Sequence, residues 1–503
     1  MPRTRATGKN ATPIRSGRLI SPDDLFAIAL VSDPQPSPDG SAVAFVVTRL
    51  DKTADTYKAA IWLADLATGE SRQLTSGDGR DASPRWSPDG SVIAFSSNRT
   101  PQLASAGEKT ETGAKPASQI WTIPVAGGEA RQLTNRPLGA SSPCWSPDGR
   151  SIAFLSTVEA KDDRDRPETH DPLADERVID AIRYRHDGRG FVAGNRTHIW
   201  TISAVGGDPA QLTFGDVDDG ELAWSPDGRL IAFTSNRSDG RDLNVVSAVY
   251  AVPAAGGAVR NLAELDASFG LPAWSPDGAK IAFLGHERAN ESGRIVRVWT
   301  AKSGGSAPRC LTADLDRSFV DEGMSDLFVG SDVRPVWSGD GKSIFSLASG
   351  RGETHVWRID AKSGEAKQIT SGKRRVAAFA LAGKQIVCLA AESDRPFELY
   401  ACKLDGSGWR QLTHHNTAFL EEVALSPAEE IIFPSAAGDR EIQGWIIKPP
   451  AFDPGVTYPM IVQIHGGPHA MYGYAPFHEM QLMAARGSVV LFTNPRGSAG
   501  YGE

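Results

Sequence analysis

The sequence predicts an all-β propeller of seven blades followed by the first part of an α/β domain. A Trp-Ser-Pro-Asp-Gly unit recurs between residues 37 and 341, and a repeat of about 40 to 45 residues is typical of four-stranded propeller blades. Beyond residue 433 this repeat stops, and a strand, a Gly-rich loop, a helix and a second strand follow one another. At 503 residues the chain is also too long for one hydrophobic core, so several domains or a repeat array are expected.

The first repeated unit predicts a tight turn between two strands of one blade. Its full copies, each preceding an Ile-Ala-Phe run, are Trp86–Gly90, Trp145–Gly149, Trp224–Gly228 and Trp274–Gly278, and its partial copies are Ser37–Gly40 and Trp337–Gly341. In such a turn Pro fixes φ, Asp bonds the nearby backbone and Gly accepts a positive φ. We expect the Trp and the Ile-Ala-Phe run to pack one blade against the next, so these motifs are interpreted as scaffold.

The second repeated unit ends each blade with a sequence close to Gln-Leu-Thr, and it gives the number of blades. Seven copies occur, at 73–75, 132–134, 211–213, 261–263, 310–312, 368–370 and 411–413. A single blade cannot bury both of its faces, so radial closure of several blades is what stabilises the array.

Two insertions lengthen the blades. Residues 101–118 are rich in Gly, Ala, Lys and Glu, and they predict a mobile loop. Residues 159–196 lengthen the third blade and contain a charged run, Lys161–Arg166. We expect a solvated hairpin extension there, with an arm that reaches a substrate chamber or a partner subunit as the alternative.

Composition excludes several classes of partner. The net charge of -8 provides no basic surface for nucleic acid, and no segment has the roughly 20 apolar residues that span a bilayer. The four cysteines are far apart and lack zinc-site spacing, which favours free thiols in a reducing, cytoplasmic setting. Residues 1–20 are basic and lack the apolar run of a signal peptide, so we expect a disordered arm there. Nothing in the sequence points to a metal or a cofactor.

The second domain begins near residue 433. Residues 442–447 alternate like a strand, and Met460–Ile464 is an apolar run typical of a strand buried on both faces. A helix is predicted at about Phe477–Arg486, before a second buried strand at Ser488–Phe492. This order predicts a parallel strand–helix–strand unit.

The loop that follows the first of these strands, His465-Gly466-Gly467-Pro468, carries the chemistry. In α/β-hydrolases a His-Gly-Gly loop at this place supplies a backbone N–H to the oxyanion hole, which stabilises charge that exists only in the transition state. Two consecutive glycines let the backbone approach that oxygen closely. Gly467 and Gly466 are therefore the oxyanion-hole candidates, and a tight turn without a partner is the structural alternative.

Together the motifs resemble a known family. The propeller repeats, His465–His469 and the motif Asn494–Gly502 are similar to the prolyl oligopeptidase family of serine peptidases, and within it to the acylaminoacyl-peptidase and dipeptidyl-aminopeptidase branch. The resemblance covers about residues 19–503. It implies hydrolysis of short peptides by a Ser, Asp and His triad, with the propeller capping the site. It also implies that His465, Pro468 and Arg496 belong to loops beside the active site.

The catalytic nucleophile of that family is missing from this sequence. α/β-Hydrolases carry it in a Gly-x-Ser-x-Gly elbow, followed by Asp and then His, and the sequence contains no such elbow. Ser498 lies in Gly497-Ser498-Ala499-Gly500, which has the wrong spacing and follows the wrong strand. His465, His469 and His478 precede any nucleophile, so none of them is expected to be the triad base. The paired acids Glu421-Glu422 and Glu429-Glu430 are interpreted as solvated charges.

The domain prediction is therefore an N-terminal arm at 1–22, a propeller at 23–432 and an incomplete hydrolase domain at 433–503. Two strands and one helix of a parallel sheet leave apolar faces and strand edges bare, so we expect either a continuing polypeptide or a second chain to complete the sheet. The chain by itself is expected to be inactive, and its oligomeric state is left open. The alternative function is a non-catalytic binding or scaffold propeller similar to TolB, against which the strand–loop–helix unit argues.

Overall fold

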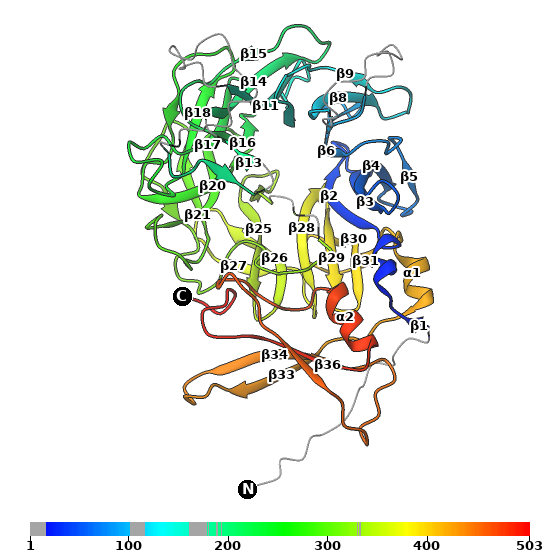
Figure 1. Ribbon diagram of the computed structural model, residues 1–503. Coiled ribbons are helices and arrows are strands. Elements are labelled where there is room, and N and C mark those ends of the chain that lie inside the picture. The colour runs from blue at the N-terminus through cyan, green and yellow to red at the C-terminus, as the bar shows by residue number, and fades with distance from the viewer. Residues whose placement is uncertain are drawn as a thin grey trace.

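The computed structural model describes residues 17–100, 116–159, 179, 181–187, 190–192, 194–328, 330 and 333–503. Strands form most of these residues, and the sheets stand around a ring, from blue β2 to yellow β28 (Figure 1). The predicted all-β propeller architecture is confirmed. The predictions for 101–118 and 159–196 fall largely outside the described residues.

Five antiparallel sheets of the ring contain four strands each. The first contains β2 (Leu30–Pro36), β3 (Ala42–Asp51), β4 (Thr56–Asp65) and β5 (Ser71–Gln73). The second contains β6 (Asp81–Trp86), β7 (Val92–Ser97), β8 (Gln119–Pro124) and β9 (Arg131–Gln132). The third contains β10 (Ala140–Trp145), β11 (Ser151–Glu159), β14 (Asn195–Ser203) and β15 (Ala210–Gln211). The fourth contains β16 (Asp219–Trp224), β17 (Leu230–Ser235), β18 (Ala248–Pro253) and β19 (Arg260–Asn261). The fifth contains β20 (Ala267–Trp274), β21 (Lys280–Glu287), β22 (Arg297–Lys302) and β23 (Arg309–Cys310).

An eight-stranded sheet completes the ring. Its first four strands are β24 (Val336–Trp337), β25 (Ser343–Gly350), β26 (Glu353–Asp360) and β27 (Ala366–Gln368). Its last four are β28 (Arg375–Ala382), β29 (Gln385–Glu392), β30 (Arg395–Lys403) and β31 (Arg410–Gln411). One parallel pairing, of Thr354 with Arg375, joins the two groups. A short hairpin, β12 (Arg185–His186) with β13 (Gly190–Phe191), projects from the third sheet's insertion.

The Trp-Ser-Pro-Asp-Gly units form the predicted turns and also link the sheets. In the second sheet the Ser87 hydroxyl donates to Asp89 Oδ1 at 2.5 Å, and Gly90 has a φ of 73°, close to the 66 to 71° of its counterparts at this turn. Each Trp indole N–H donates to a carbonyl oxygen of the preceding sheet. The pairs are Trp86 with Gln35 (2.8 Å), and Trp145 with Arg85, Trp224 with Cys144, Trp274 with Ala223 and Trp337 with Ala273 (3.0 Å each). The Trp is therefore a hydrogen-bonded link between sheets as well as a packing group.

The Gln-Leu-Thr segments at the ends of the blades replace ladder hydrogen bonds where the outermost strand ends. In the second sheet Thr134 Oγ1 accepts from the Ile120 N–H at 2.9 Å, and the Gln132 side chain donates to the Thr134 carbonyl at 2.6 Å. The same two bonds recur at Thr75, Thr213, Thr370 and Thr413. These residues satisfy backbone groups that would otherwise be buried without a partner.

The ring closes through side chains, because in the part of the chain that the structure describes no strand of the first sheet pairs with a strand of the eight-stranded sheet. Asn416 accepts from the Ala29 N–H at 2.8 Å and donates to the Ala29 carbonyl at 3.0 Å. Glu398 accepts from the Asn416 N–H at 2.8 Å and from the Thr413 hydroxyl at 2.6 Å. Apolar residues of β2, β3, β28, β29 and β30 pack around this closure in one core cluster.

The N-terminal arm was predicted to be disordered through residue 20, and this prediction was wrong for residues 18 and 19, which form a strand. β1 (Arg18–Leu19) pairs in parallel with β32 (Val423–Ala424), and a 3-10 helix covers Pro22–Phe26. The Arg18 guanidinium binds Asp24, and this contact, together with the Ser21 hydrogen bonds, lowers the pKa of the Asp24 carboxyl to about 2. The short helix α1 (Thr417–Glu422) leads into β32.

The sheet that follows the propeller in the chain lies below the ring in Figure 1. It has the strand order β33 (Glu429–Pro434), β34 (Glu441–Ile447), β36 (Val489–Asn494) and β35 (Met460–Gln463), with α2 (His478–Ala485) between β35 and β36 in the chain. β35 and β36 are parallel, so the predicted strand–helix–strand unit is confirmed. β33 begins at Glu429, four residues before the predicted start of this domain at 433.

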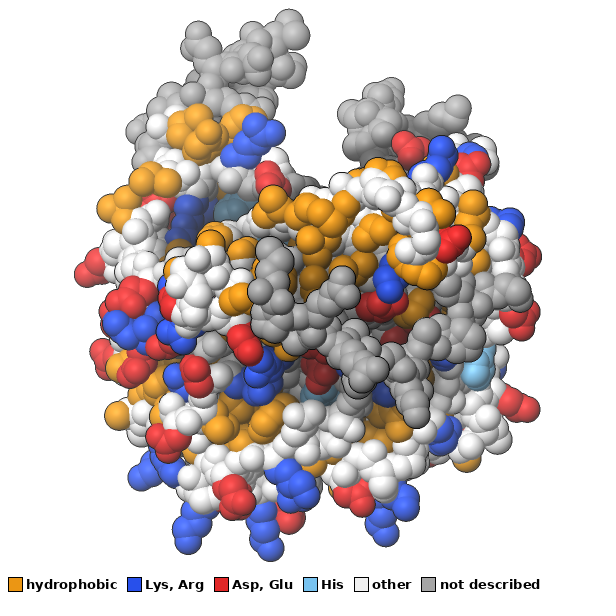
Figure 2. Space-filling model, turned by 90° about the horizontal axis from the view of Figure 1, so that it is seen from below, with side chains coloured by type: hydrophobic (Ala, Val, Ile, Leu, Met, Phe, Trp, Pro, Cys, Tyr) orange, Lys and Arg blue, Asp and Glu red, His pale blue; other side chains and the backbone are white. Residues whose placement is uncertain are grey.

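The prediction that Met460–Ile464 is buried on both faces was wrong. β35 is an edge strand, and Met460, Val462 and Ile464 are 59%, 48% and 77% exposed. Hydropathy reports only that a strand has apolar faces and does not reveal which neighbours cover them. Viewed from below, where this sheet lies, the surface shows patches of hydrophobic side chains (Figure 2).

The propeller fixes the position of α2. Asp326 accepts hydrogen bonds from the His478 and Glu479 N–H groups at 2.8 and 2.9 Å, so a residue of the ring caps the first turn of this helix. Met480 and Ala484 on α2 pack against Trp445 of β34 in one core cluster. In the described part of the chain, no helix has the length and apolar character needed to cross a membrane.

Candidate functional site

The His465–Pro468 loop leaves the carboxyl end of β35, which is the edge where parallel α/β sheets bind their ligands. Gly466 and Gly467 are exposed. Gly467 has a φ of 126°, and a Cβ added there would lie 2.9 Å from the His469 nitrogen, so only glycine fits. Within the described part of the chain, neither the Gly466 nor the Gly467 N–H donates a hydrogen bond, which leaves both donors available to an oxygen of a ligand.

The His465 side chain points back beneath its own loop. It is 9% exposed, its Nδ1 lies 2.9 Å from the Gly466 carbonyl oxygen, and its Nε2 lies 2.9 Å from Ser498 Oγ. A carbonyl oxygen only accepts, so Nδ1 carries the proton. Nε2 makes the second hydrogen bond of the ring, with Ser498 Oγ. The ring also stands edge-on to Tyr472 at 5.1 Å.

The Ser498 and His465 pair has the spacing of a nucleophile and its base, but the rest of its geometry differs from a triad. Ser498 is only 8% exposed, and its Oγ also lies 2.8 Å from the Pro495 carbonyl. His465 Nδ1 faces a carbonyl, whereas a triad orients its histidine with a carboxylate. The pair therefore joins two loops.

The remaining predicted site residues are divided between two places. Pro468 is exposed beside the glycines, and His469 Nδ1 donates to the Gly497 carbonyl at 2.9 Å. His469 also lies against Gly293 of the propeller, where an added Cβ would be 2.7 Å from its ring. Arg496 instead points toward the β33–β34 turn, where it binds Asp439 at 2.6 Å. His478 lies at the start of α2, away from the glycine loop in the chain.

A buried polar chain beneath the loop was not identified from the sequence. Asn494, the last residue of β36, accepts from the Tyr472 N–H and donates to the Tyr472 carbonyl, both at 2.8 Å. It also donates to the Tyr501 hydroxyl at 2.8 Å, which in turn donates to Gln443 Oε1 at 2.5 Å. Burial raises the pKa of Tyr501 to about 12, so the phenol stays a donor. Polar residues at the end of a buried strand were the signal that could have revealed this chain.

The propeller places acidic groups beside the same loop. The Met324 N–H donates to the Met471 carbonyl at 3.0 Å, which joins the two parts. Nearby, Asp321 is paired with Arg375 at 2.7 Å. Burial raises the pKa of the Glu322 carboxyl, which accepts from the Ser318 hydroxyl at 2.7 Å. The acidic pairs singled out in the sequence, Glu421-Glu422 and Glu429-Glu430, are all exposed.

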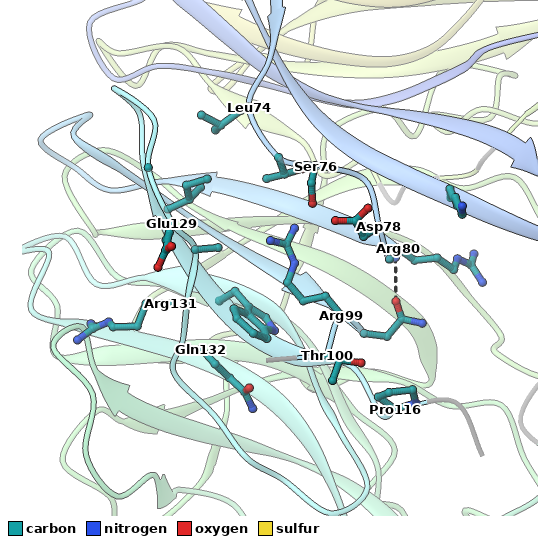
Figure 3. Close-up of a pocket in the computed structure, with 18 of the residues that line it drawn as sticks. Leu74, Ser76, Asp78, Arg80, Arg99, Thr100, Pro116, Glu129, Arg131 and Gln132 are labelled. Atoms are coloured by element: carbon teal, nitrogen blue, oxygen red, sulfur yellow. Dashed lines mark hydrogen bonds between the residues drawn. The ribbon is translucent and has the colours of Figure 1, made fainter. Parts of the chain in front are cut away.

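A large cavity lies elsewhere, between the first and second sheets of the ring. Its volume is about 1070 Å³, and it is lined by residues from Thr56 to Gln132, none of them a predicted site residue. Figure 3 shows Ser76 and Asp78 on one side of this cavity and Arg99 on the other, with the Arg80 N–H bonded to Asn98. The glycine loop is therefore not part of this cavity.

Known proteins resemble both parts of the chain. Residues 168–396 match the family described as the acylaminoacyl-peptidase N-terminal β-propeller domain. Over 494 residues the chain is 38% identical to the uncharacterized peptidase YuxL of Bacillus subtilis (strain 168), an alignment that covers 97% of this chain and 72% of YuxL. The chain belongs to the prolyl oligopeptidase family of peptidases.

One further relative and one solved structure agree with this assignment. The chain is 25% identical over 516 residues to dipeptidyl-peptidase 5 of Porphyromonas gingivalis, covering 97% of this chain and 69% of that enzyme. An acylaminoacyl peptidase solved in complex with Z-Gly-Gly-Phe-chloromethyl ketone has the same fold, with a TM-score of 0.73 at 23% identity over 95% of this chain and 67% of that one.

Proposed function

We propose that this chain supplies the propeller and one wall of the active site of a serine peptidase that hydrolyses short peptides. The observation that carries the proposal is the pair of N–H groups at Gly466 and Gly467, which have no acceptor among the described residues and lie at the carboxyl end of a parallel strand. The names of the relatives, peptidases of acylaminoacyl and dipeptidyl type, support a peptide substrate.

The Gly467 N–H, with Gly466 beside it, is the proposed donor to the oxyanion of the tetrahedral intermediate. Such a donor accelerates acyl transfer because it stabilises negative charge that is absent from the ground state. The positive φ of Gly467 fixes the direction of the amide before substrate arrives, so no reorganisation is needed during the reaction.

The nucleophile, acid and base of the triad lie outside these 503 residues in this proposal. No Gly-x-Ser-x-Gly occurs in the sequence, and Ser498 is buried in a contact with His465. The chain by itself is therefore proposed to be inactive. The exposed edge of β35, with Met460 and Val462 bare, supports completion of the sheet by further hydrolase strands.

The propeller is proposed to have seven blades, counting the two halves of the eight-stranded sheet separately, and to restrict access to short peptides. It contacts the segment that follows the glycine loop, where Gly293 lies against the His469 ring and the Met324 N–H donates to the Met471 carbonyl. The four free cysteines support a reducing, cytoplasmic setting.

A fluorophosphonate probe, which reacts with activated serines, tests the proposal. The polypeptide encoded by the whole gene should be labelled on one serine, and mass spectrometry should place that serine in a Gly-x-Ser-x-Gly elbow. The 503-residue chain should stay unlabelled. Labelling of Ser498, or of the 503-residue chain at any serine, contradicts the proposed assignment.

A further inference from the structure

Residues 465–472, which begin with the glycine loop, are joined by five hydrogen bonds to Asn494 and the loop that follows it. They are His465 Nε2 with Ser498 Oγ (2.9 Å), His469 Nδ1 to the Gly497 carbonyl (2.9 Å), the Ala499 N–H to the Ala470 carbonyl (3.1 Å), and the two bonds between Asn494 and Tyr472 (2.8 Å each). Three of these five use a side chain of a residue from the Asn494–Tyr501 loop.

The loop after β36 starts from a well-anchored strand. β36 pairs with β34 on one side and with β35 on the other. Asn494 is the last residue of β36 and is only 3% exposed. Asn494 therefore offers residues 465–472 an anchor on a strand that is paired on both sides.

Ser498 acts on the oxyanion donors through one intermediate group. Its hydroxyl meets Nε2 of His465, and Nδ1 of the same ring donates to the carbonyl of Gly466. That carbonyl belongs to the same peptide unit as the Gly467 N–H, because one planar peptide group contains both. The orientation of the imidazole thus sets the direction of the amide that the proposed function places at the oxyanion.

We propose that Ser498 and Asn494 are positioning residues for the oxyanion hole, with Ser498 acting through His465 on the Gly466–Gly467 peptide and Asn494 acting through the Tyr472 backbone. This inference rests on the proposed function. It assigns the Asn494-Pro495-Arg496-Gly497-Ser498 motif a role in catalysis without contact to substrate. Arg496 has no part in this positioning role, because its side chain binds Asp439.

Kinetics of the polypeptide encoded by the whole gene test the inference. Ser498→Ala should lower kcat for a short chromogenic peptide by about 10- to 100-fold, the effect of removing a group that orients a catalytic one, and should leave KM within about twofold because the donors act mainly in the transition state. Ser488→Ala is the matched control, since Ser488 lies at the opposite end of β36. His465→Gln combined with Ser498→Ala should cost no more than the larger single effect, because both act on one path.

Nitrogen-15 spectra of the histidine rings give a readout that a merely structural role does not move. In the wild type His465 should be protonated at Nδ1 and hydrogen-bonded at Nε2. In Ser498→Ala the Nε2 resonance should move toward that of an unbonded ring nitrogen while the thermal unfolding midpoint and the other histidine resonances stay in place. An unchanged Nε2 resonance overturns the inference.

The outcomes separate the two proposals. If the wild-type product neither hydrolyses peptides nor takes up the fluorophosphonate probe, the proposed function fails. If the wild type is active and Ser498→Ala has the same kcat, or loses activity only through a raised KM, the proposed function stands and the positioning role is wrong.

Discussion

The hydrogen bonds from Trp to the preceding sheet can be tested by comparing Trp274→Phe with Trp121→Phe. Both indoles are buried, at 9% and 4% exposure. The Trp274 N–H donates to the Ala223 carbonyl at 3.0 Å, whereas the Trp121 N–H has no partner among the described residues. The two substitutions remove the same part of the ring, so the loss of buried area largely cancels between them.

What is left in the comparison is the hydrogen bond. Trp274→Phe leaves the carbonyl of Ala223 without its hydrogen-bond donor. Ala223 is only 7% exposed, and an unsatisfied buried acceptor costs about 1–3 kcal/mol. Trp121→Phe removes a donor that was already unpaired, so it carries no such cost. Trp274→Phe should therefore be less stable by at least about 1 kcal/mol, measured as a lower urea midpoint by far-ultraviolet circular dichroism with an unchanged slope. Equal midpoints for the two variants would refute the claim that the indole links adjacent sheets.

Three further predictions follow from contacts between distant parts of the chain. Asn416→Ala leaves both backbone groups of Ala29 without a partner, so it should cost about 2–6 kcal/mol and speed hydrogen exchange in β2 but not in β16; equal protection in β2 contradicts closure by this side chain. Burial raises the pKa of the Glu398 carboxyl above its ordinary value of 4.5. The contribution of Glu398 to folding stability is therefore complete below about pH 4.5, and it is lost as the pH rises through the pKa of the folded state. Glu398→Gln should remove that decline in urea midpoint above pH 4.5, and an unchanged pH dependence counts against the buried carboxyl. Asp326→Ala removes the cap of α2 and should cost about 1 kcal/mol, seen as faster exchange of the α2 amides alone, whereas unaltered α2 exchange means that the cap contributes nothing.

The repeat units were predictable because their structure is local. The turn at Ser87-Pro88-Asp89-Gly90 needs only residues within five positions of one another, and its chemistry is visible in the sequence. The partner of the Trp86 indole is not local. It is the carbonyl of Gln35 in another sheet, and its position depends on how two sheets pack. The closure of Ala29 by Asn416 joins residues 387 positions apart, which no periodicity reveals.

The candidate site was partly predictable for the same reason. The His-Gly-Gly-Pro motif identified the loop, and the parallel strands identified its edge of the sheet. The contact between His465 and Ser498 follows from that topology, because the carboxyl ends of neighbouring parallel strands meet at one edge. The sequence did not reveal that β35 lies at the edge of its sheet, since an apolar run such as Met460–Ile464 is compatible with either an edge or a central strand.

The most direct test of the account is the kinetic effect of Gly467→Ala in the polypeptide encoded by the whole gene, compared with Gly487→Ala. Both glycines have a positive φ, 126° and 88°, but a Cβ at Gly467 meets the loop backbone at 2.9 Å, whereas one at Gly487 meets nothing within 4 Å. If the Gly467 N–H is an oxyanion donor, Gly467→Ala should lower kcat by about 100-fold or more, and Gly487→Ala should leave kcat near that of the wild type. Equal kcat values for the two variants, with both proteins folded, would contradict the assignment of this loop to the active site.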